Sequence, residues 1–471
     1  MNILPSAGIT FKQLERIFFE IGCDVARTLM EQYLLKADEI LEKTRDKASL
    51  RHKGSRTTSI KTLMGEVQMK RTLYRRVNEA GATEHIFLLD KALGLDTIGT
   101  ISPNLVEKIL EYSCEMSYRE VSEAVTGLTN QSISHQGVWN VVQAVGERQA
   151  EEEKRLVRAY ENDELCGERE VPVLFEEADG LWLSMQRESR KGSSKGKSEL
   201  KIGVVYEGWE QRYPCSKEYK TIEKTAFAGY MKPGDFKALR DAVVAEKYNT
   251  DEIQYRVLNG DGAPWIVNGH DTEDSLFQLD PYHLSKSVIR NVYDKNSRRH
   301  IMRWLKEGQF EKVFRKLEEL KYECGGLESE VKKLTALEVY IKSNKGSIVP
   351  YRERAGIKLP SPPEGVEYRN LGTMERNVNI FAKRMKGGKS WSIQGASNLS
   401  KIIALKMGKN FNDRVAFLVS GKLSERLTER FEEAIRTTEA FAEKAVRKSV
   451  YPMRRGEIPF SNSKVTNGRK A

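Results

Sequence analysis

Cysteine is scarce in this sequence of 471 residues, and long apolar runs are missing from it. The five cysteines are far apart and include no C-x-x-C pair. That spacing argues against a disulfide framework and against a zinc finger, and it suits a reducing cytoplasm. No apolar run reaches the length needed to span a bilayer, and the first residues lack the basic and apolar regions of a secretory signal. We therefore expect a cytoplasmic protein.

Charged residues, by contrast, are abundant and unbalanced in sign. Lys and Arg number 78 against 67 Asp and Glu, which gives a net charge of +11. Such an excess suggests a polyanionic partner, most simply nucleic acid, although a generic basic surface gives the same balance. Hydrophobic residues make up 39% of the chain, enough for well-packed cores, and the length suggests two to four domains.

The first predicted region, residues 1–95, combines a long helix with a basic hairpin. Residues 11–45 carry apolar side chains spaced by three and four, which is typical of an amphipathic helix. Residues 59–76 contain two alternating runs around a turn at Gly65, with several Lys and Arg among them. This pattern predicts a β-hairpin whose basic side chains either face solvent or follow a phosphate backbone.

The second predicted region, residues 96–168, is helical. A helix over Tyr118–Val125, a turn near Gly127 and a second helix capped by Ser134 have the spacing of a helix-turn-helix DNA-binding motif. An ordinary helical hairpin has the same pattern. Residues 147–168 are highly charged and are expected to form a connecting helix.

From residue 171 onward the pattern predicts strands. Three strand-like runs, a helix over 233–247 and two further strands are the element order of a ribonuclease-H-like α/β core. We assign 169–283 to the first part of this core and 351–448 to its second part, which includes the C-terminal helices. An all-helical insertion, 284–350, interrupts the core, and 449–471 is expected to be a flexible basic tail. The predicted fold is a multidomain α+β protein.

One carboxylate, Asp261, stands between two glycines where the fourth of these strands ends. A turn alone would explain the glycines, but an acid at the tip of a buried strand is also a common metal ligand. In a ribonuclease-H-like core, acids on the first strand, after the fourth strand and on a later helix lie together. Here that rule selects Asp179, Asp261 and Glu375, a set of oxygen ligands suited to Mg²⁺. The glycines would then allow a close approach to Asp261.

Four motifs occur in order along the chain: ADGLW (178–182), GDGAPWI (260–266), LDPYHLSKS (279–287) and GTMERNVNIFAKRMKGGKSWS (372–392). Together they resemble the ISLre family of bacterial insertion-sequence DDE transposases, which are relatives of the Mutator-type transposases. The resemblance covers essentially the whole chain.

The resemblance implies that Asp179, Asp261 and Glu375 are the catalytic DDE triad and bind two Mg²⁺ ions, with Mn²⁺ as a substitute. Asp280 and His283 would match the D-x-x-H signature of Mutator-like enzymes. The implied partners are double-stranded DNA, at the transposon ends and at the target, and further copies of the chain in a homodimer or higher oligomer. The implied location is the bacterial cytoplasm, with nucleoid association when the protein is bound to DNA.

Other residues of these segments have two interpretations each. His283 either bonds to Asp280 or a DNA phosphate, or simply caps a helix. Trp304, beside Arg303, is either a core anchor or a platform that stacks on an unpaired base. The basic residues after Glu375 either face DNA or form a solvated surface; they are Lys383, Arg384, Lys386 and Lys389.

Two other functions fit the same sequence features. One is a hydrolytic nuclease or resolvase on a ribonuclease-H-like fold, and the other is a helix-turn-helix regulator without catalytic activity. The long N-terminal region and the helical insertion favour the transposase.

Overall fold

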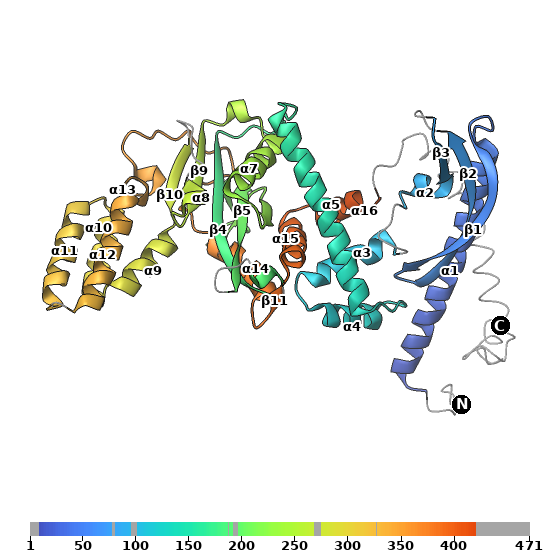
Figure 1. The fold of residues 1–471 in the computed structure, drawn as a ribbon, viewed down its shortest axis with the longest axis horizontal. Helices are drawn as coiled ribbons and strands as arrows, with labels where there is room; N and C mark the ends of the chain where they lie inside the picture. Colours follow the sequence, from blue (N-terminus) through green and yellow to red (C-terminus); the bar gives the residue numbers. More distant parts are fainter. Residues whose placement is uncertain are drawn as a thin grey trace, which may run out of the picture. The chain divides into compact units, whose positions relative to one another are not determined.

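A computed structural model describes residues 9–77, 81–95, 101–186, 188–191, 196–267, 275–325 and 327–420. The chain divides into two compact units, Met1–Val145 with Asn412–Ala471, and Gly146–Phe411. Both units contain helices, and sheets occur in each, so the protein is a multidomain mixed α/β protein (Figure 1). Among the described residues, no helix is both long and apolar enough to cross a membrane.

The first unit begins with the long helix α1 (Phe11–Thr44), which packs against an antiparallel sheet. The sheet has the order β1 (Arg51–Thr62), β2 (Gly65–Val77) and β3 (Thr83–Phe87). The helix 11–45 and the hairpin predicted from the sequence are therefore present, and the hairpin is longer than predicted and gains a third strand. The buried Asp38 of α1 accepts hydrogen bonds from the backbone N and the Oγ1 of Thr72, which ties the helix to β2.

Short helices follow in the first unit. Ser117 and Glu120 form a capping box at the start of α4, and His135 begins α5, one residue after the predicted cap Ser134. The short helices are α2 (Leu88–Leu93), α3 (Pro103–Ser113), α4 (Tyr118–Leu128) and, near the end of the described chain, α16 (Phe411–Ser420). The longer α5 (His135–Glu161) begins in this unit and belongs to the second unit from Gly146 onward.

The charged helix predicted over 147–168 is present as far as Glu161, as the continuation of α5, which runs without a break from His135; residues 162–168 are not helical. Gly146 does not end the helix. A Cβ at this position would lie 2.7 Å from the Cα of Asn398, so the glycine allows the backbone of another segment to approach closely. Close packing, and not a helix end, accounts for this glycine.

The second unit is built on a mixed sheet of the order β10-β9-β4-β5-β8. Strands β4, β9 and β10 are parallel, and β5 is antiparallel to both β4 and β8. The helix α7 (Pro233–Lys247) buries Phe236, Leu239 and Val243 against one face of this sheet. The strands are β4 (Val173–Met185), β5 (Lys197–Tyr206), β8 (Thr225–Gly229), β9 (Tyr255–Gly260) and β10 (Ser275–Leu279), and the two-residue β11 (Ser390–Trp391) pairs with the end of β4.

The third of the predicted strand-like runs, residues 219–230, forms two strands. β7 (Tyr219–Thr221) pairs with β6 (Trp209–Gln211), and only β8 joins the main sheet. Glu223, between them, has φ 50°, a left-handed backbone conformation that ends a strand. Short elements complete this part: α6 (Glu188–Lys191), η1 (Thr250–Glu252) and α8 (Pro264–Val267).

Between β10 and the later helices, the chain forms a helical block with its own apolar core. Its helices are α9 (Pro281–Asn291), α10 (Lys295–Lys306), α11 (Phe310–Glu323), α12 (Glu328–Ser343) and α13 (Lys345–Ile348). After η2 (Tyr351–Glu353), the chain returns to the sheet as α14 (Met374–Met385) and α15 (Ile393–Met407). The helix predicted over 421–448 and the tail 449–471 lie outside the described residues, and the sequence pattern had not indicated α15 or α16.

Candidate active site

The register of two parallel strands places Asp179 and Asp261 at the same level. Glu177 of β4 pairs with Asn259 of β9, and each acid follows its pairing residue by two positions. The β4–β9 ladder ends at this pair, whereas the ladder of β4 with β11 begins at Ser184. A stretch of the β4 edge therefore lies open between β9 and β11, beside the two carboxylates.

Glu375, in the first turn of α14, completes the group. It lines one cavity of about 320 Å³ together with Asp179 and Asp261. The structure thus brings the three acids selected from the sequence into one pocket, although they come from the middle of one strand, the end of another and a distant helix. The other lining side chains include Trp182, Glu199, Tyr282, His283, Lys286 and Lys386.

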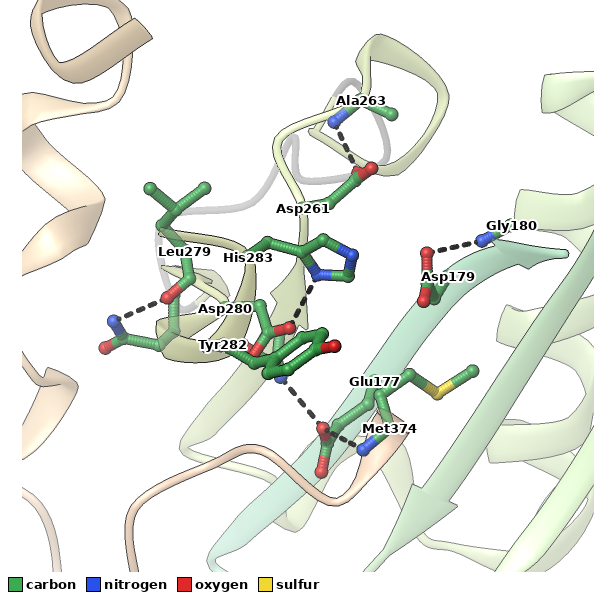
Figure 2. A network of polar contacts seen from close by, with 12 residues as sticks. Glu177, Asp179, Gly180, Asp261, Ala263, Leu279, Asp280, Tyr282, His283 and Met374 are labelled. Carbon is green, nitrogen blue, oxygen red and sulfur yellow. Dashed lines mark hydrogen bonds and ion pairs between the residues drawn. The ribbon is translucent and has the colours of Figure 1, made fainter. Parts of the chain in front are cut away.

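A buried carboxylate, Glu177, connects the three segments that carry these acids. It is only 1% exposed and lies two residues before Asp179 on β4. Asn259, two residues before Asp261, donates to its Oε2 at 2.8 Å. Thr373 donates to its Oε1 through Oγ1 at 2.6 Å, and the backbone N of Met374 donates to Oε2 at 3.0 Å, immediately before Glu375 (Figure 2).

Tyr206 of β5 adds a further hydrogen bond, from its Oη to Oε1 of Glu177 at 2.5 Å. Burial raises the pKa of the Glu177 carboxyl, and the donors around it oppose that shift. Among the described residues, each hydrogen-bond partner of the Glu177 carboxylate is a donor, which is the arrangement that an ionised carboxylate requires. Glu177 therefore fixes the relative positions of β4, β9 and the start of α14.

The electrostatics of the pocket reflect crowded acids. Burial raises the pKa of Asp179 to about 6, and the nearby Asp261 and Asp280 contribute in the same direction. His283 and the backbone N–H of Gly180, which donates to Oδ1 of Asp179 at 2.7 Å, oppose the shift. A cation in the pocket would offset the repulsion between these carboxylates.

Asp280 and His283 form a bonded pair on the wall of the pocket. The Nδ1 of His283 lies 2.7 Å from Oδ2 of Asp280, and this hydrogen bond raises the pKa of the imidazole. Asp280 is buried and also caps α9 by accepting from the backbone N of Tyr282. Figure 2 shows the imidazole next to Asp179 and Asp261, so Asp280 orients the ring toward the acids.

The two glycines beside Asp261 have local structural roles. Gly262 adopts φ +89°, which favours glycine, and a Cβ on Gly260 would lie 2.7 Å from Cγ2 of Ile266. The Oδ1 of Asp261 accepts from the backbone N of Ala263 at 2.9 Å, while Tyr340 of α12 donates to its carbonyl oxygen at 2.9 Å. The turn and its packing account for these glycines without an approaching substrate.

The donor chemistry of the pocket fits a hard divalent cation. Carboxylate oxygens line it on several sides, and those of Glu199 and Glu375 have no hydrogen bond or ion pair with any described residue. In the described part of the chain, however, no three Asp, Glu, His or Cys side chains are arranged as a ready-made metal site. The acids share a pocket without forming a closed coordination shell.

The remaining residues singled out in the sequence are spread around this unit. Trp304 is half-buried, packs against the core of the helical block and stacks on His300, with ring centroids 5.5 Å apart; Arg303 beside it is exposed. After Glu375, Lys386 lines the pocket and Lys383 is exposed. The guanidinium of Arg384 is buried over the ring of Trp391. The Nζ of Lys389 donates to the carbonyl oxygen of Arg384. Arg384 therefore lies in the core and not on a DNA-facing surface.

Sequence reasoning missed four residues of this site. Glu177 and Glu199 are ordinary glutamates in strand-forming runs, and no local pattern distinguishes them. Lys286 lies three residues after His283 in the motif LDPYHLSKS, so helix spacing from His283 would have indicated it; Tyr282 lies in the same motif, but as the neighbour of His283 it is not indicated by that spacing.

The fold and the pocket define a multidomain α/β protein with a carboxylate-lined cavity beside an open strand edge. The chain belongs to the uncharacterised protein family UPF0236, whose family model matches residues 4–449. It is similar to a UPF0236 protein of Caldanaerobacter subterraneus subsp. tengcongensis, with 26% identity over 417 residues that cover 85% of this chain and 79% of the relative. It is also similar to the UPF0236 protein in vanSb 3′ region of Streptococcus gallolyticus, with 27% identity over 354 residues that cover 72% and 70% of the two chains.

Proposed function

We propose that this protein is a DNA transposase that binds the ends of its insertion sequence and cuts and joins DNA strands in the Asp179–Asp261–Glu375 pocket. The observation that carries the proposal is the convergence of these three acids, selected from the sequence, in one cavity. Unrelated surface acids among 67 would rarely meet in this way. A common hydrogen-bond partner, Glu177, holds the segments that bear them.

The topology supports a ribonuclease-H-like core. Strands β4, β5 and β8 form an antiparallel series, and β9 and β10 extend it in parallel on the other side of β4, in the order β10-β9-β4-β5-β8. This is the arrangement expected when three strands, a helix and two further strands make such a core. The helical block between Asp261 and Glu375, which has its own apolar core, supports the proposal that an all-α insertion interrupts this core.

A DNA-binding role for the first unit is supported by the exposed start of α5. His135, Gln136, Trp139 and Asn140 all face solvent there, after the short helix α4 and its turn. In a helix-turn-helix motif, these first residues of the second helix contact base edges in the major groove. The exposed basic residues of the β1–β2 hairpin and the net charge of +11 add attraction to the phosphate backbone.

The residues of the pocket suit phosphoryl transfer. Asp179, Asp261 and Glu375 would hold two Mg²⁺ or Mn²⁺ ions, which supply activation of the attacking oxygen and stabilisation of the leaving oxygen. Lys286 and Lys386 line the same cavity and would bind the phosphates on either side of the cut. His283, held by Asp280 through Nδ1, would present Nε2 as a donor to a phosphate oxygen.

The names of two relatives each contain several locus tags, which is what we expect of proteins encoded by a mobile element. One similar UPF0236 protein carries eleven locus tags of a single bacterial genome in its name, and another carries four. Repetition of a coding sequence within one genome is what copies of an insertion sequence produce.

The test is to incubate the purified full-length protein with Mg²⁺ and labelled DNA from the flanks of its own gene, and to map cleavage and joining. We expect strand cleavage at the element ends and transfer of the freed 3′-hydroxyl to a second DNA. Asp179→Asn, Asp261→Asn and Glu375→Gln should each abolish both steps while end binding persists, because each amide keeps the shape but removes the charge.

Other outcomes identify the other functions. Cleavage without joining, with every variant inactive, would indicate a hydrolytic nuclease or resolvase on the same fold. Specific end binding with no cleavage by the unmodified protein would indicate a DNA-binding regulator.

A further inference from the structure

We propose that Glu199 is a fourth carboxylate of the cation-binding pocket, with Gly180 as the residue that admits it. This inference rests on the proposed function, because it assigns a further ligand to the same pocket. Glu199 belongs to β5 and lines the cavity together with Asp179, Asp261 and Glu375. It lies outside the four motifs that indicated the triad.

Gly180 is the structural reason that the Glu199 side chain reaches the pocket. A Cβ built on Gly180 would lie 2.1 Å from Oε1 of Glu199 and 2.8 Å from its Cδ, well inside van der Waals contact. The three nearest atoms to that position all belong to the Glu199 side chain. The carboxylate therefore lies across β4 at the one position of the strand that has no side chain.

The surroundings of Glu199 leave its carboxylate available to a cation. Within the described chain, no residue forms a hydrogen bond or an ion pair with it, in contrast to Glu176, whose carboxylate pairs with Arg240 and Arg256. This half-buried carboxylate lies near Asp261, and the charge of Lys201 offsets its own only in part, so a cation in the pocket would stabilise it further. Each added carboxylate raises the charge that a site offers to a hard cation.

The test is a Tb³⁺ titration of the full-length protein, because Tb³⁺ prefers oxygen ligands and gains luminescence from a neighbouring indole. Trp182 lines the same pocket and is 48% exposed, so excitation of tryptophan reports binding there. We expect Glu199→Gln to weaken Tb³⁺ binding by roughly 10–100-fold, the range seen when a supporting group of a metal site is lost. Glu246→Gln, an exposed glutamate outside the pocket, should leave it unchanged.

Gly180→Ala provides a second, independent variant. Its methyl group should push the Glu199 carboxylate aside and weaken Tb³⁺ binding as Glu199→Gln does. The double variant Gly180→Ala/Glu199→Gln should bind Tb³⁺ about as weakly as Glu199→Gln alone, because both changes remove the same ligand. Gly234→Ala, where a Cβ meets nothing within 4 Å, is the matched control. Stabilisation of each variant by Mg²⁺ or Mn²⁺ in thermal unfolding gives a readout that does not depend on Trp182.

The outcomes separate this inference from the proposed function. Tb³⁺ binding that needs Asp179 and Asp261 but is unchanged in Glu199→Gln would overturn the role of Glu199 and leave the triad in place. Absence of Tb³⁺ and Mg²⁺ binding to the unmodified protein would overturn the cation pocket itself. Additive losses for Gly180→Ala and Glu199→Gln would show that the glycine acts by another route.

Discussion

Glu177 offers a direct test of how the pocket is held together, through the substitution Glu177→Gln. The amide keeps the shape of the side chain but has a single acceptor oxygen. If that oxygen takes the place of Oε1, it retains the bonds from Tyr206 and Thr373. The donors on Oε2, Asn259 Nδ2 and the backbone N of Met374, then face an amide nitrogen.

Two buried donors without acceptors cost about 1–3 kcal/mol each, so we expect a loss of roughly 2–6 kcal/mol in the free energy of unfolding. A domain of about 10 kcal/mol stability, in the middle of the usual range of about 5–15 kcal/mol, would remain folded. Cleavage should fall roughly 100-fold, since a shift of about 1 Å at a reacting group has that effect. End binding by the first unit should not change.

Glu176→Gln is the matched control for Glu177→Gln. The carboxylate of the adjacent Glu176 pairs with Arg240 of α7 and Arg256 of β9, away from the acids. Breaking this buried pair should cost about 3–5 kcal/mol of stability but leave cleavage per folded molecule near the unmodified level. Urea unfolding followed by tryptophan fluorescence, with cleavage measured well below the transition, compares the two. Equal cleavage in both variants would refute the positioning role of Glu177.

Three further predictions concern residues outside this network. Replacing Gln136 and Asn140 by Ala should weaken specific end binding at least tenfold without lowering the melting temperature; unchanged binding would remove α5 from the DNA interface. Lys386→Ala should weaken DNA binding and reduce its salt dependence, because Lys386 lines the pocket. Arg384→Ala should lower the melting temperature instead, because Arg384 forms a buried cation–π contact. Weaker DNA binding only in Arg384→Ala, with a lower melting temperature only in Lys386→Ala, would contradict the placement of the two residues. Trp304→Ala should lower the free energy of unfolding by about 2 kcal/mol, since the ring is half-buried. It should slow cleavage equally on intact and abasic DNA ends. Faster cleavage of an abasic end by this variant would instead support the base-stacking interpretation.

The strands and the three acids were predictable because their signals are local. Asp261 stands between two glycines, and one of these, Gly262, needs a left-handed backbone, so the end of β9 is visible in the sequence. Apolar runs of strand length mark β4, β5 and β9, and their order aligns Asp179 with Asp261. The helical block is visible because its charges and apolar spacing break the strand pattern.

Other features depend on contacts that no local pattern reports. The partners of Glu177 include residues 82 and 197 positions away, so its burial becomes visible only after the chain has folded. Glu223 ends a strand in a left-handed conformation that is rare for glutamate, and ion pairs with Lys247 and Lys409 accompany it. In the sequence alone, Gly146 suggests the end of a helix. Only the folded structure shows that the backbone of Asn398 packs against this position and leaves no room for a side chain.

The contact between Glu177 and Thr373 also has a consequence for protein synthesis. These residues are 196 positions apart, and the segment between them includes the whole helical block. At about 5–20 residues per second, a ribosome needs roughly 10–40 s to travel from one to the other. Throughout that time the growing chain has Asp179 but not Glu375, so the pocket is incomplete. If the proposed function is correct, a chain released early would keep the first unit, which we propose to bind DNA, without the pocket that we propose to cut it, and would compete with finished copies for the same DNA ends.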